Sequence, residues 1–399
     1  MDVDRIDAAR PAKRVGIVTY FRNCNYGSSL QAFALQEVVR SLGYDARIID
    51  YLDRSNPSNV AFRRRRVIQQ AVCSLRAPIA SWRLRTAGGH SRQQSEEKRR
   101  AFERFERERL NVYSEDYTFP SAFDAFVCGS DQVWNLAAPG LHEVFFLRFA
   151  PQEKRVAYAP SFGMESVPRY NRAQLGRFLS DFPFLSVREQ SGVEIVSRLT
   201  GRSVSQVLDP VLLAGERFWE DLRESDAHPE PEKPYALAYF LSDNDDAVAE
   251  VAKEAAAHGE TIVWIDAGVA PPSGVEASAP DPLEFVSLLA GASCVYTDSF
   301  HGFAFAAMMG APFVLFNRNY EGGAGQATRI VSLLDMLYGQ KGDAGLIRFS
   351  SKRCGSADVR MRLEAEREAS LSYLSRALAS ACGDGSASMS SEARDDREA

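Results

Sequence analysis

The stretch RVGIVTYFRNCNYGSSLQAFALQEVVRSLGYDARIIDY, residues 14–51, decides the fold class. Its first part, residues 14–20, is a short apolar and β-branched run of the kind that forms a buried parallel strand. After a polar loop, apolar side chains recur at helical spacing from residue 30 up to Gly43, which suits the end of a helix. Residues 45–51 resemble another strand. This order of strand, loop, helix and strand predicts the opening of a doubly wound α/β domain.

The same alternation continues along the chain. Further strands are expected within 122–130, 155–163, 184–192 and 204–213, which gives an N-terminal domain over 14–215 after a polar lead, 1–13. A Pro- and Glu-rich linker at 228–234 precedes a second series, with strands at 235–242, 261–268, 294–299 and 311–317. We therefore predict a second Rossmann-like domain over 216–350, with a ligand cleft between the strand ends of the two. A helix over 357–382 and a disordered polar tail over 383–399 complete the chain.

The composition indicates a globular protein with no strong charge bias. Of its 399 residues 45% are hydrophobic, and the net charge is −6, which argues against a nucleic-acid binder. The cysteines are scattered, with no CxxC pair and no Cys/His cluster, so we expect reduced thiols and no metal site. They are Cys24, Cys73, Cys128, Cys294, Cys354 and Cys382. No apolar signal core and no run of about 18 apolar residues is present, so a cytoplasmic protein is expected.

Residues 59–110 interrupt the α/β pattern with two helical stretches. Between residues 60 and 100, eleven Arg or Lys stand against two Glu. Apolar side chains recur among the arginines from Phe62 to Trp82, so an amphipathic helix could lie on an anionic membrane surface. The alternative is a solvated helical insertion or a lid over the cleft. Peripheral membrane contact is thus one of two interpretations of this segment.

Two polar loops follow predicted strands of the first domain. The first contains Asn25, Tyr26, Gly27 and Ser28 at the start of a helix. Amides and hydroxyls at such a position favour an anion or a sugar hydroxyl, although an ordinary capped turn has the same sequence. The second contains Gly129, Ser130, Asp131, Gln132, Trp134 and Asn135. It combines hydrogen-bonding groups with one ring on which a sugar could stack; the alternative is a capped helix start with Trp134 in the core.

His301 lies at the junction of a predicted strand and helix, and Gly302 beside it leaves space. Imidazole exchanges protons near neutral pH, so His301 is a candidate general acid or base, although a lone His is more often structural. The remaining histidines appear in polar surroundings and are expected to be solvated. They are His90, His142, His228 and His258.

Three arginines are expected at the same edge. Arg188 follows a predicted strand and could bind a carboxylate or phosphate, or pair with Glu189 or Asp209. Arg318 and Arg329 flank a glycine-rich segment. Taken singly each is a surface charge, but together with His301 they would form a cationic patch suited to a small dianion.

Six segments occur in the order typical of polysaccharide pyruvyl transferases, which the chain resembles from about residue 14 to residue 337. They are NYGSSLQAFALQ, DAFVCGSDQVWN, RVAYAPSFG, SVREQSG, VLDPVLL and YTDSFHGFAFA. The resemblance implies a GT-B-like arrangement of the two domains and a C-terminal helix that crosses back to the first. It also implies transfer of an enolpyruvyl group from phosphoenolpyruvate to a sugar of a bacterial polysaccharide or lipid-linked precursor, as a pyruvate ketal and without a cofactor.

The resemblance assigns roles to residues of both domains. The family's Arg and His fall on Arg188 and His301, which become the catalytic candidates. The donor-binding candidates are Arg318, Arg329, Ser299 and Gly302, and the two polar loops form the acceptor side. Family members often carry Lys where this chain reads Phe316-Asn317-Arg318-Asn319, so Arg318 is the nearest cation. The alternatives are a GT-B glycosyltransferase that uses a nucleotide sugar and a non-catalytic sugar-binding relic of the fold.

Overall fold

The computed structural model describes residues 12–76, 95–118, 122–136, 141–226, 228, 231–318, 327–340 and 347–384. Most of the polar lead, the middle of the basic insertion and the glycine-rich segment 319–326 lie outside the described residues. The predicted disordered tail lies outside them from residue 385 onward.

The first half of the chain forms a parallel sheet with the strand order β3-β2-β1-β4-β5-β6-β7. Its strands are β1 (Arg14–Val18), β2 (Asp45–Ile49), β3 (Val112–Tyr113), β4 (Ala125–Cys128), β5 (Arg155–Ala157), β6 (Phe184–Val187) and β7 (Ser205–Gln206). Helices α1 (Tyr26–Ser41), α5 (Arg169–Ser180), α6 (Gln190–Thr200) and α7 (Pro210–Ala214), with the 3-10 turns η1 (Glu143–Phe146) and η2 (Gln152–Lys154), accompany it. The apolar runs of the sequence become central strands that are buried on both faces, as β1, β4 and β5 are. The order reverses between β1 and β4, where loops diverge and leave room for a ligand.

The second half forms a sheet with the order β10-β9-β8-β11-β12-β13. Its strands are β8 (Tyr235–Tyr239), β9 (Thr261–Ile265), β10 (Ala277–Ser278), β11 (Cys294–Thr297), β12 (Phe313–Leu315) and β13 (Ile347–Phe349). Helices α8 (Glu216–Ser225), α9 (Asp245–His258), α10 (Pro282–Gly291), α11 (Phe300–Met308), α12 (Ala327–Tyr338) and α13 (Ser351–Cys354) belong to this half. The same reversal lies between β8 and β11. Only β13 departs from the predicted parallel alternation among the described strands: it pairs antiparallel with β12, as edge strands of such sheets often do.

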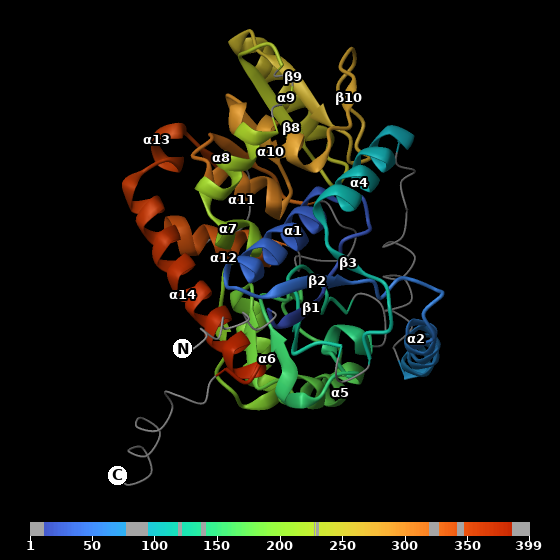
Figure 1. The fold of residues 1–399 in the computed structure, drawn as a ribbon. Coiled ribbons are helices and arrows are strands. Elements are labelled where there is room, and N and C mark those ends of the chain that lie inside the picture. The colour runs from blue at the N-terminus through green and yellow to red at the C-terminus, as the bar shows by residue number, and fades with distance from the viewer. Residues whose placement is uncertain are drawn as a thin grey trace, which may run out of the picture.

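The two sheets face each other in the GT-B-like arrangement that was predicted (Figure 1). Tyr26, at the start of α1, is fully buried where the halves meet. Its ring stacks on Phe285 of α10 with centroids 4.3 Å apart, and its hydroxyl donates to the carbonyl of Pro280 at 2.9 Å. The larger of two hydrophobic clusters includes residues of both halves, from Val15 in β1 to Phe303 in α11. The halves are therefore packed together rather than merely linked.

Helix α14 (Ala357–Ala381) returns from the second half to the first, as the family resemblance implied (Figure 1). Ser370 Oγ accepts a hydrogen bond from the backbone of Leu208 at 3.0 Å, and the hydroxyl of Tyr373 donates to the carbonyl of Ala157 at 3.2 Å. Leu374 of the same helix is fully buried. Helix α14 thus packs against the first half and is joined to it by hydrogen bonds.

The described part of the basic insertion consists of α2 (Pro57–Arg76) and α4 (Glu96–Arg109). Helix α4 corrects the expectation of a solvated insertion. Lys98 is only 4% exposed, and its Nζ donates to the carbonyl of Asp266 at 2.6 Å, across the boundary between the halves. The helix packs this way because its apolar face, with Phe102, points toward Tyr26. Helix α4 therefore joins the halves, while α2 lies on the outer side of the first half (Figure 1).

None of the described helices is both long enough and apolar enough to cross a lipid bilayer. The cysteines whose side chains are described are free thiols. They are Cys24, Cys128, Cys294, Cys354 and Cys382.

Candidate active site

A cavity of about 190 Å³ lies between the facing edges of the two sheets. The first half lines it with Tyr20, Asn23, Asn25, Ser28, Asp131 and Gln132, and the second half with Leu241, Ser299, Phe300, His301, Arg318 and Arg329. Most of these residues lie just after β1, β4, β8 and β11. These are the strands at which the order of each sheet reverses, so the cavity occupies the position where doubly wound folds bind ligands.

The wall from the first half is a chain of short polar contacts. Asn25 caps α1, because its side chain accepts from the backbone of Ser28 at 3.2 Å. Ser28 Oγ donates to Asp131 at 2.6 Å and accepts from Asn23 Nδ2 at 3.1 Å. With its amide oxygen turned toward Arg329, Gln132 accepts from the Nε of that arginine at 3.1 Å. Amide and hydroxyl groups are thus held in place on this side of the cavity.

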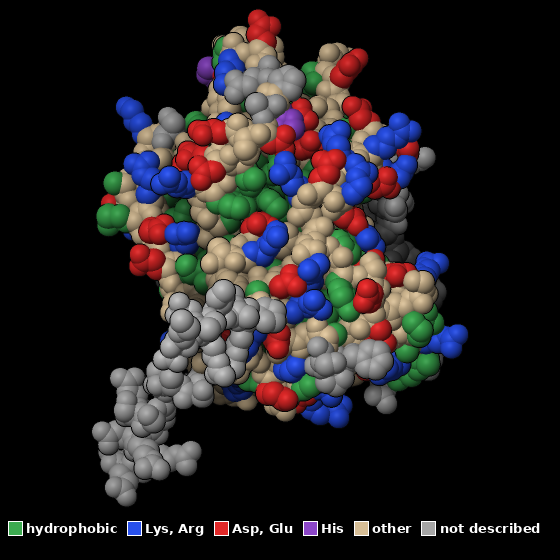
Figure 2. Space-filling view, viewed as in Figure 1, with side chains coloured by type: hydrophobic (Ala, Val, Ile, Leu, Met, Phe, Trp, Pro, Cys, Tyr) green, Lys and Arg blue, Asp and Glu red, His purple; other side chains and the backbone are tan. Residues whose placement is uncertain are grey.

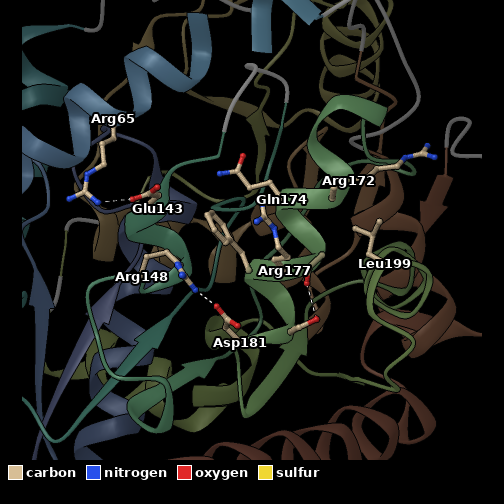
Figure 3. Close-up of a pocket in the computed structure, with 12 residues that line it drawn as sticks. Arg65, Glu143, Arg148, Arg172, Gln174, Arg177, Asp181 and Leu199 are labelled. Atoms are coloured by element: carbon tan, nitrogen blue, oxygen red, sulfur yellow. Dashed lines mark hydrogen bonds and ion pairs between the residues drawn. The ribbon is translucent and has the colours of Figure 1, made fainter. Parts of the chain in front are cut away.

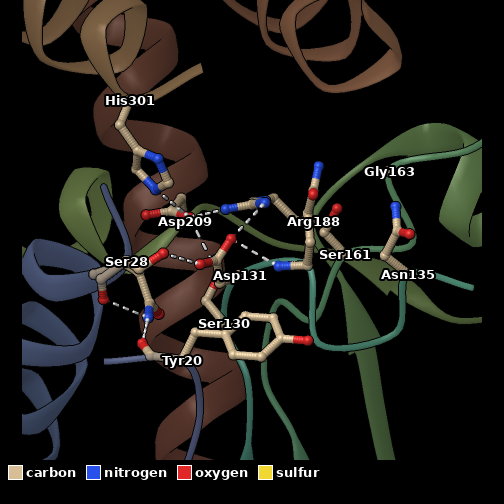
Figure 4. A network of polar contacts seen from close by, with 12 residues as sticks. Tyr20, Ser28, Ser130, Asp131, Asn135, Ser161, Gly163, Arg188, Asp209 and His301 are labelled. Atoms are coloured by element: carbon tan, nitrogen blue, oxygen red, sulfur yellow. Dashed lines mark hydrogen bonds and ion pairs between the residues drawn. The ribbon is translucent and has the colours of Figure 1, made fainter. Parts of the chain in front are cut away.

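Asp209 joins the two catalytic candidates (Figure 4). Asp209 is the N-cap of α7, and it is only 1% exposed. Arg188 donates to its Oδ2, Ser130 Oγ donates to the same oxygen at 3.1 Å, and His301 Nε2 lies 3.5 Å away. Burial alone would raise the pKa of Asp209, but His301 and Arg188 together hold this pKa well below its usual range. The site therefore contains a buried carboxylate anion between a guanidinium and an imidazole.

His301 comes from the second half, whereas its partner Asp209 comes from the first. The ring is 6% exposed and sits in the first turn of α11, whose N-cap Ser299 accepts from the backbone of Gly302 at 3.4 Å. The backbone of Gly27 approaches this ring so closely that a β-carbon there would lie 2.0 Å from Nδ1. The helix start that was predicted to bind a ligand thus packs directly against the imidazole.

The arginines gather around Phe300. The guanidinium of Arg188 lies 4.6 Å from the centroid of this ring, and that of Arg329 lies 5.8 Å from it. Arg318 Nε donates to the carbonyl of Asp298 at 3.2 Å. Burial, together with repulsion from Arg188 and Arg318, lowers the pKa of Arg329 to about 9. Positive charge is therefore crowded on this side of the cavity, and an anion would relieve that crowding.

The cavity brings together about half of the predicted site residues. Those that line it are Asn25, Ser28, Asp131, Gln132, Ser299, His301, Arg318 and Arg329. Arg188 does not line it; this residue lines a narrow cleft of about 10 Å³ with Phe300 and Arg329, which both spaces share. The predicted pairing of Arg188 with Asp209 is present. Outside the lining are Tyr26, Gly27, Gly129, Ser130, Trp134, Asn135 and Gly302.

Trp134 takes the alternative given for it, a place in the core, and Tyr26 does not reach the cavity. The ring of Trp134 is fully buried and stacked on Phe146, with centroids 5.5 Å apart, so it offers no face to a sugar and the predicted stacking role is wrong. Its Nε1 donates to the carbonyl of Phe145 at 2.9 Å, which satisfies its polar atom inside the core. Tyr26 is enclosed in the contact between the halves and reaches no ligand space.

Gly129, Ser130, Asn135 and Gly302 support the site from behind. A β-carbon at Gly129 would lie 2.2 Å from the carbonyl of Tyr158, and one at Gly302 would lie 2.6 Å from Thr297 Oγ1, so both glycines permit close packing. Asn135 donates to the carbonyl of Phe162 at 2.9 Å. These residues shape the loops and leave the ligand contacts to their neighbours.

The sequence analysis overlooked four residues that line the cavity, and it gave Asp209 only as a possible structural partner of Arg188. The four are Tyr20, Asn23, Leu241 and Phe300. A signal was present for Asp209, since it follows the last strand of the first sheet and precedes a proline at the start of a helix. The role of Phe300 depends on arginines that lie far from it in sequence, and no local pattern marks it.

Two doubly wound halves with a polar cavity between their strand ends define a GT-B-like α/β protein. The model of the polysaccharide pyruvyl transferase family matches residues 25–320. The chain therefore belongs to the polysaccharide pyruvyl transferase family.

Several solved structures are similar in fold. The glycotransferase of kitacinnamycin is 17% identical, with 93% of this chain and 98% of that chain covered and a TM-score of 0.37. The glycosyltransferase SnogD from Streptomyces nogalater is 14% identical, with 93% and 98% covered and a TM-score of 0.36. The UDP-GlcNAc 2-epimerase from Methanocaldococcus jannaschii is 11% identical, with 88% and 98% covered and a TM-score of 0.38. A comparison with curated proteins finds no match.

Proposed function

We propose that this transferase moves the enolpyruvyl group of phosphoenolpyruvate onto two hydroxyls of a sugar, which forms a pyruvate ketal and releases phosphate. The observation that carries the proposal is the presence of Arg329 and Arg318 in the cavity lining, where burial and repulsion from neighbouring arginines lower the pKa of Arg329 to about 9. A compact donor with a carboxylate and a phosphate would neutralise this charge.

The reaction needs one group that transfers protons. A proton is delivered to the methylene carbon of the donor, and the oxygen of a first sugar hydroxyl bonds to the adjacent carbon while its own proton is removed. The bond to phosphate breaks, the second hydroxyl closes the ring, and its proton leaves with the phosphate. His301 is the proposed acid and base, because it is the imidazole in the lining of the cavity.

Asp209 is the proposed partner of that imidazole. Its carboxylate lies 3.5 Å from His301 Nε2, so it would orient the ring and stabilise the imidazolium that forms when the ring takes a proton. Arg188 would fix the carboxylate from the other side and contribute positive charge to the donor site. Catalysis would then depend on residues of both halves.

The acceptor is proposed to bind along the first half. Asn25, Ser28 and Gln132 present amides and hydroxyls to the cavity, and these groups suit the hydroxyls of a sugar in a polysaccharide or in its lipid-linked precursor. Trp134 would take no part in binding the sugar, since it is buried in the core.

A binding experiment tests the donor. Phosphoenolpyruvate is expected to raise the unfolding temperature, and Arg329→Gln is expected to weaken its affinity about ten- to hundredfold, the effect of losing one or two hydrogen bonds to a charged group. Arg198→Gln on α6 is the matched control, because this side chain is 62% exposed and lies outside the cavity. Absence of any phosphoenolpyruvate effect on the wild type would contradict the proposal.

Turnover separates the donor classes. With a panel of sugar acceptors, phosphate release from phosphoenolpyruvate is expected, whereas nucleotide release from nucleotide sugars would indicate a glycosyltransferase. His301→Ala is expected to lower turnover about 10²–10⁴-fold with an unchanged circular dichroism spectrum. Near-wild-type turnover of this variant would exclude the imidazole from the chemistry.

A further inference from the structure

Helix α2 exposes apolar side chains to an unusual degree. Among the described residues the large hydrophobic side chains that are exposed are Val67 at 64%, Ile68 at 62%, Val72 at 44% and Met361 at 68%. Three of these four lie within six residues of one helix. Isolated exposed apolar side chains are normal on a protein surface, but a group of them on one element indicates a contact surface.

The three side chains share one face of the helix. Positions 67, 68 and 72 are neighbours at helical spacing, and Ala71 between them is exposed as well. The opposite face holds α2 on the first half: Phe62 is 7% exposed and packs on Phe149, with ring centroids 6.0 Å apart. Because the inner face is anchored, the apolar face is presented outward.

The charge of α2 is entirely positive. The helix, PSNVAFRRRRVIQQAVCSLR, carries five arginines and no acidic residue, in a chain whose net charge is −6. Arg64 and Arg65 are exposed beside Val67 and Ile68. Figure 2 shows hydrophobic side chains next to Lys and Arg at the lower right of the molecule, where Figure 1 places α2.

An open cleft of about 740 Å³ adjoins this helix between α2, η1 and α5 (Figure 3). Four arginines line it, Arg65, Arg148, Arg172 and Arg177, against two acidic residues, Glu143 and Asp181. The acidic side chains already pair with Arg65 and Arg148. The cleft thus has an excess of positive charge next to the apolar face, and phosphate groups at a lipid surface would match it.

From these observations we infer that the outer face of α2 docks on an anionic phospholipid membrane. Val67, Ile68 and Val72 enter the boundary between head groups and acyl chains, and the arginines contact lipid phosphates. A second copy of the chain is the less favourable occupant, because a symmetric pair would bring two all-positive helices together. The docking is independent of the donor and acceptor chemistry proposed above.

Vesicle sedimentation at low salt tests the inference with the full chain. The wild type is expected to sediment with vesicles of equal parts phosphatidylglycerol and phosphatidylcholine, and to bind pure phosphatidylcholine about tenfold or more weakly. A variant with Val67→Ser, Ile68→Ser and Val72→Ser, and a second with Arg64→Gln and Arg65→Gln, are each expected to lose about tenfold or more in affinity. The matched control makes the same kinds of change on α14, Met361→Ser with Arg360→Gln, and should bind as the wild type does.

Further measurements keep the outcomes distinct. All variants should unfold close to the wild-type temperature, since the changed side chains are exposed and a surface ion pair such as Arg65–Glu143 contributes little. Light scattering should give the same mass for each. Failure of the wild type to sediment with anionic vesicles would overturn the inference, as would an equal loss in the α14 control. A wild-type dimer that the α2 variants convert to a monomer would assign the face to a second copy instead.

Discussion

Gly27 is the residue with the least space in the candidate active site. A β-carbon there would lie 2.0 Å from His301 Nδ1, so Gly27→Ala must displace the imidazole or the start of α1. We expect turnover to fall about 10²-fold or more, since a displacement of about 1 Å at a reacting group has this effect. Steady-state kinetics measure the loss.

Gly259→Ala is the control for this substitution. Gly259 ends α9, and a β-carbon there meets no atom within 4 Å, although its φ of 66° makes alanine strained. This variant should lose about 1 kcal/mol of stability and no turnover. A fully active Gly27→Ala enzyme would contradict the expectation that the close approach of Gly27 to His301 matters for turnover.

His142 gives the protein a pH-dependent stability. It was expected to be solvated, but its ring packs on Phe145 with centroids 5.1 Å apart, and burial, with Arg66 and Arg63 nearby, lowers its pKa from 6.5 to about 3. In the unfolded chain His142 therefore binds a proton below pH 6.5, whereas in the native state it binds one only below about pH 3. Stability from this residue is complete above pH 6.5 and is lost as the pH falls toward 3.

The variant His142→Phe tests this linkage. Phenylalanine keeps the aromatic contact and cannot take up a proton. Between pH 6.5 and pH 4 the wild type should lose roughly 2–4 kcal/mol more of its unfolding free energy than the variant does. Urea unfolding at several pH values gives the comparison, and parallel curves for the two proteins would contradict the assignment.

At the scale of residues, a position just after a predicted strand was the feature that identified candidate site residues. Asp131, Ser299 and His301 meet in one cavity because strand ends of both sheets converge there. Trp134 follows the same rule but turns into the core, since its burial depends on Phe146 and other aromatic side chains from later segments. The sequence around Trp134 does not indicate which aromatic side chains will pack on it.

At the scale of elements, α14 is the clearest case of a helix that stabilises a distant sheet. Leu374 is fully buried where α14 packs on the first half. Leu374→Ala should lower the free energy of unfolding by about 2–5 kcal/mol, the usual effect of removing a large buried side chain. Chemical denaturation measures the change. The exposed Met361→Ala, on the same helix, should leave stability within about 0.5 kcal/mol.

The α/β alternation made most elements predictable, because each strand and helix carries its own hydrophobic period. Helix α1 is an example: it begins at Tyr26 and ends at Ser41, close to the helix expected from residue 30 to Gly43. The place of α4 was not predictable, since Lys98 finds its partner at Asp266, in the other half of the chain. Likewise, β13 pairs antiparallel only because the chain returns to the edge of the second sheet.

At the scale of the whole molecule, the shared core predicts that the two halves unfold together. Side chains of both halves form one buried cluster, and α4, α14 and Tyr26 bridge them. Differential scanning calorimetry should therefore show one transition, with the calorimetric enthalpy equal to the van't Hoff enthalpy. Two resolved transitions would mean that the halves are thermodynamically separate.

The contact between Asp209 and His301 crosses the boundary between the halves. This contact exists only while the two halves keep their present relative position. Any separation of the halves that admits substrates would also part His301 from Asp209. The proposed acid–base pair would then be complete only when the halves are closed. In such an open state the proposed donor would not be activated, which would limit its reaction with water.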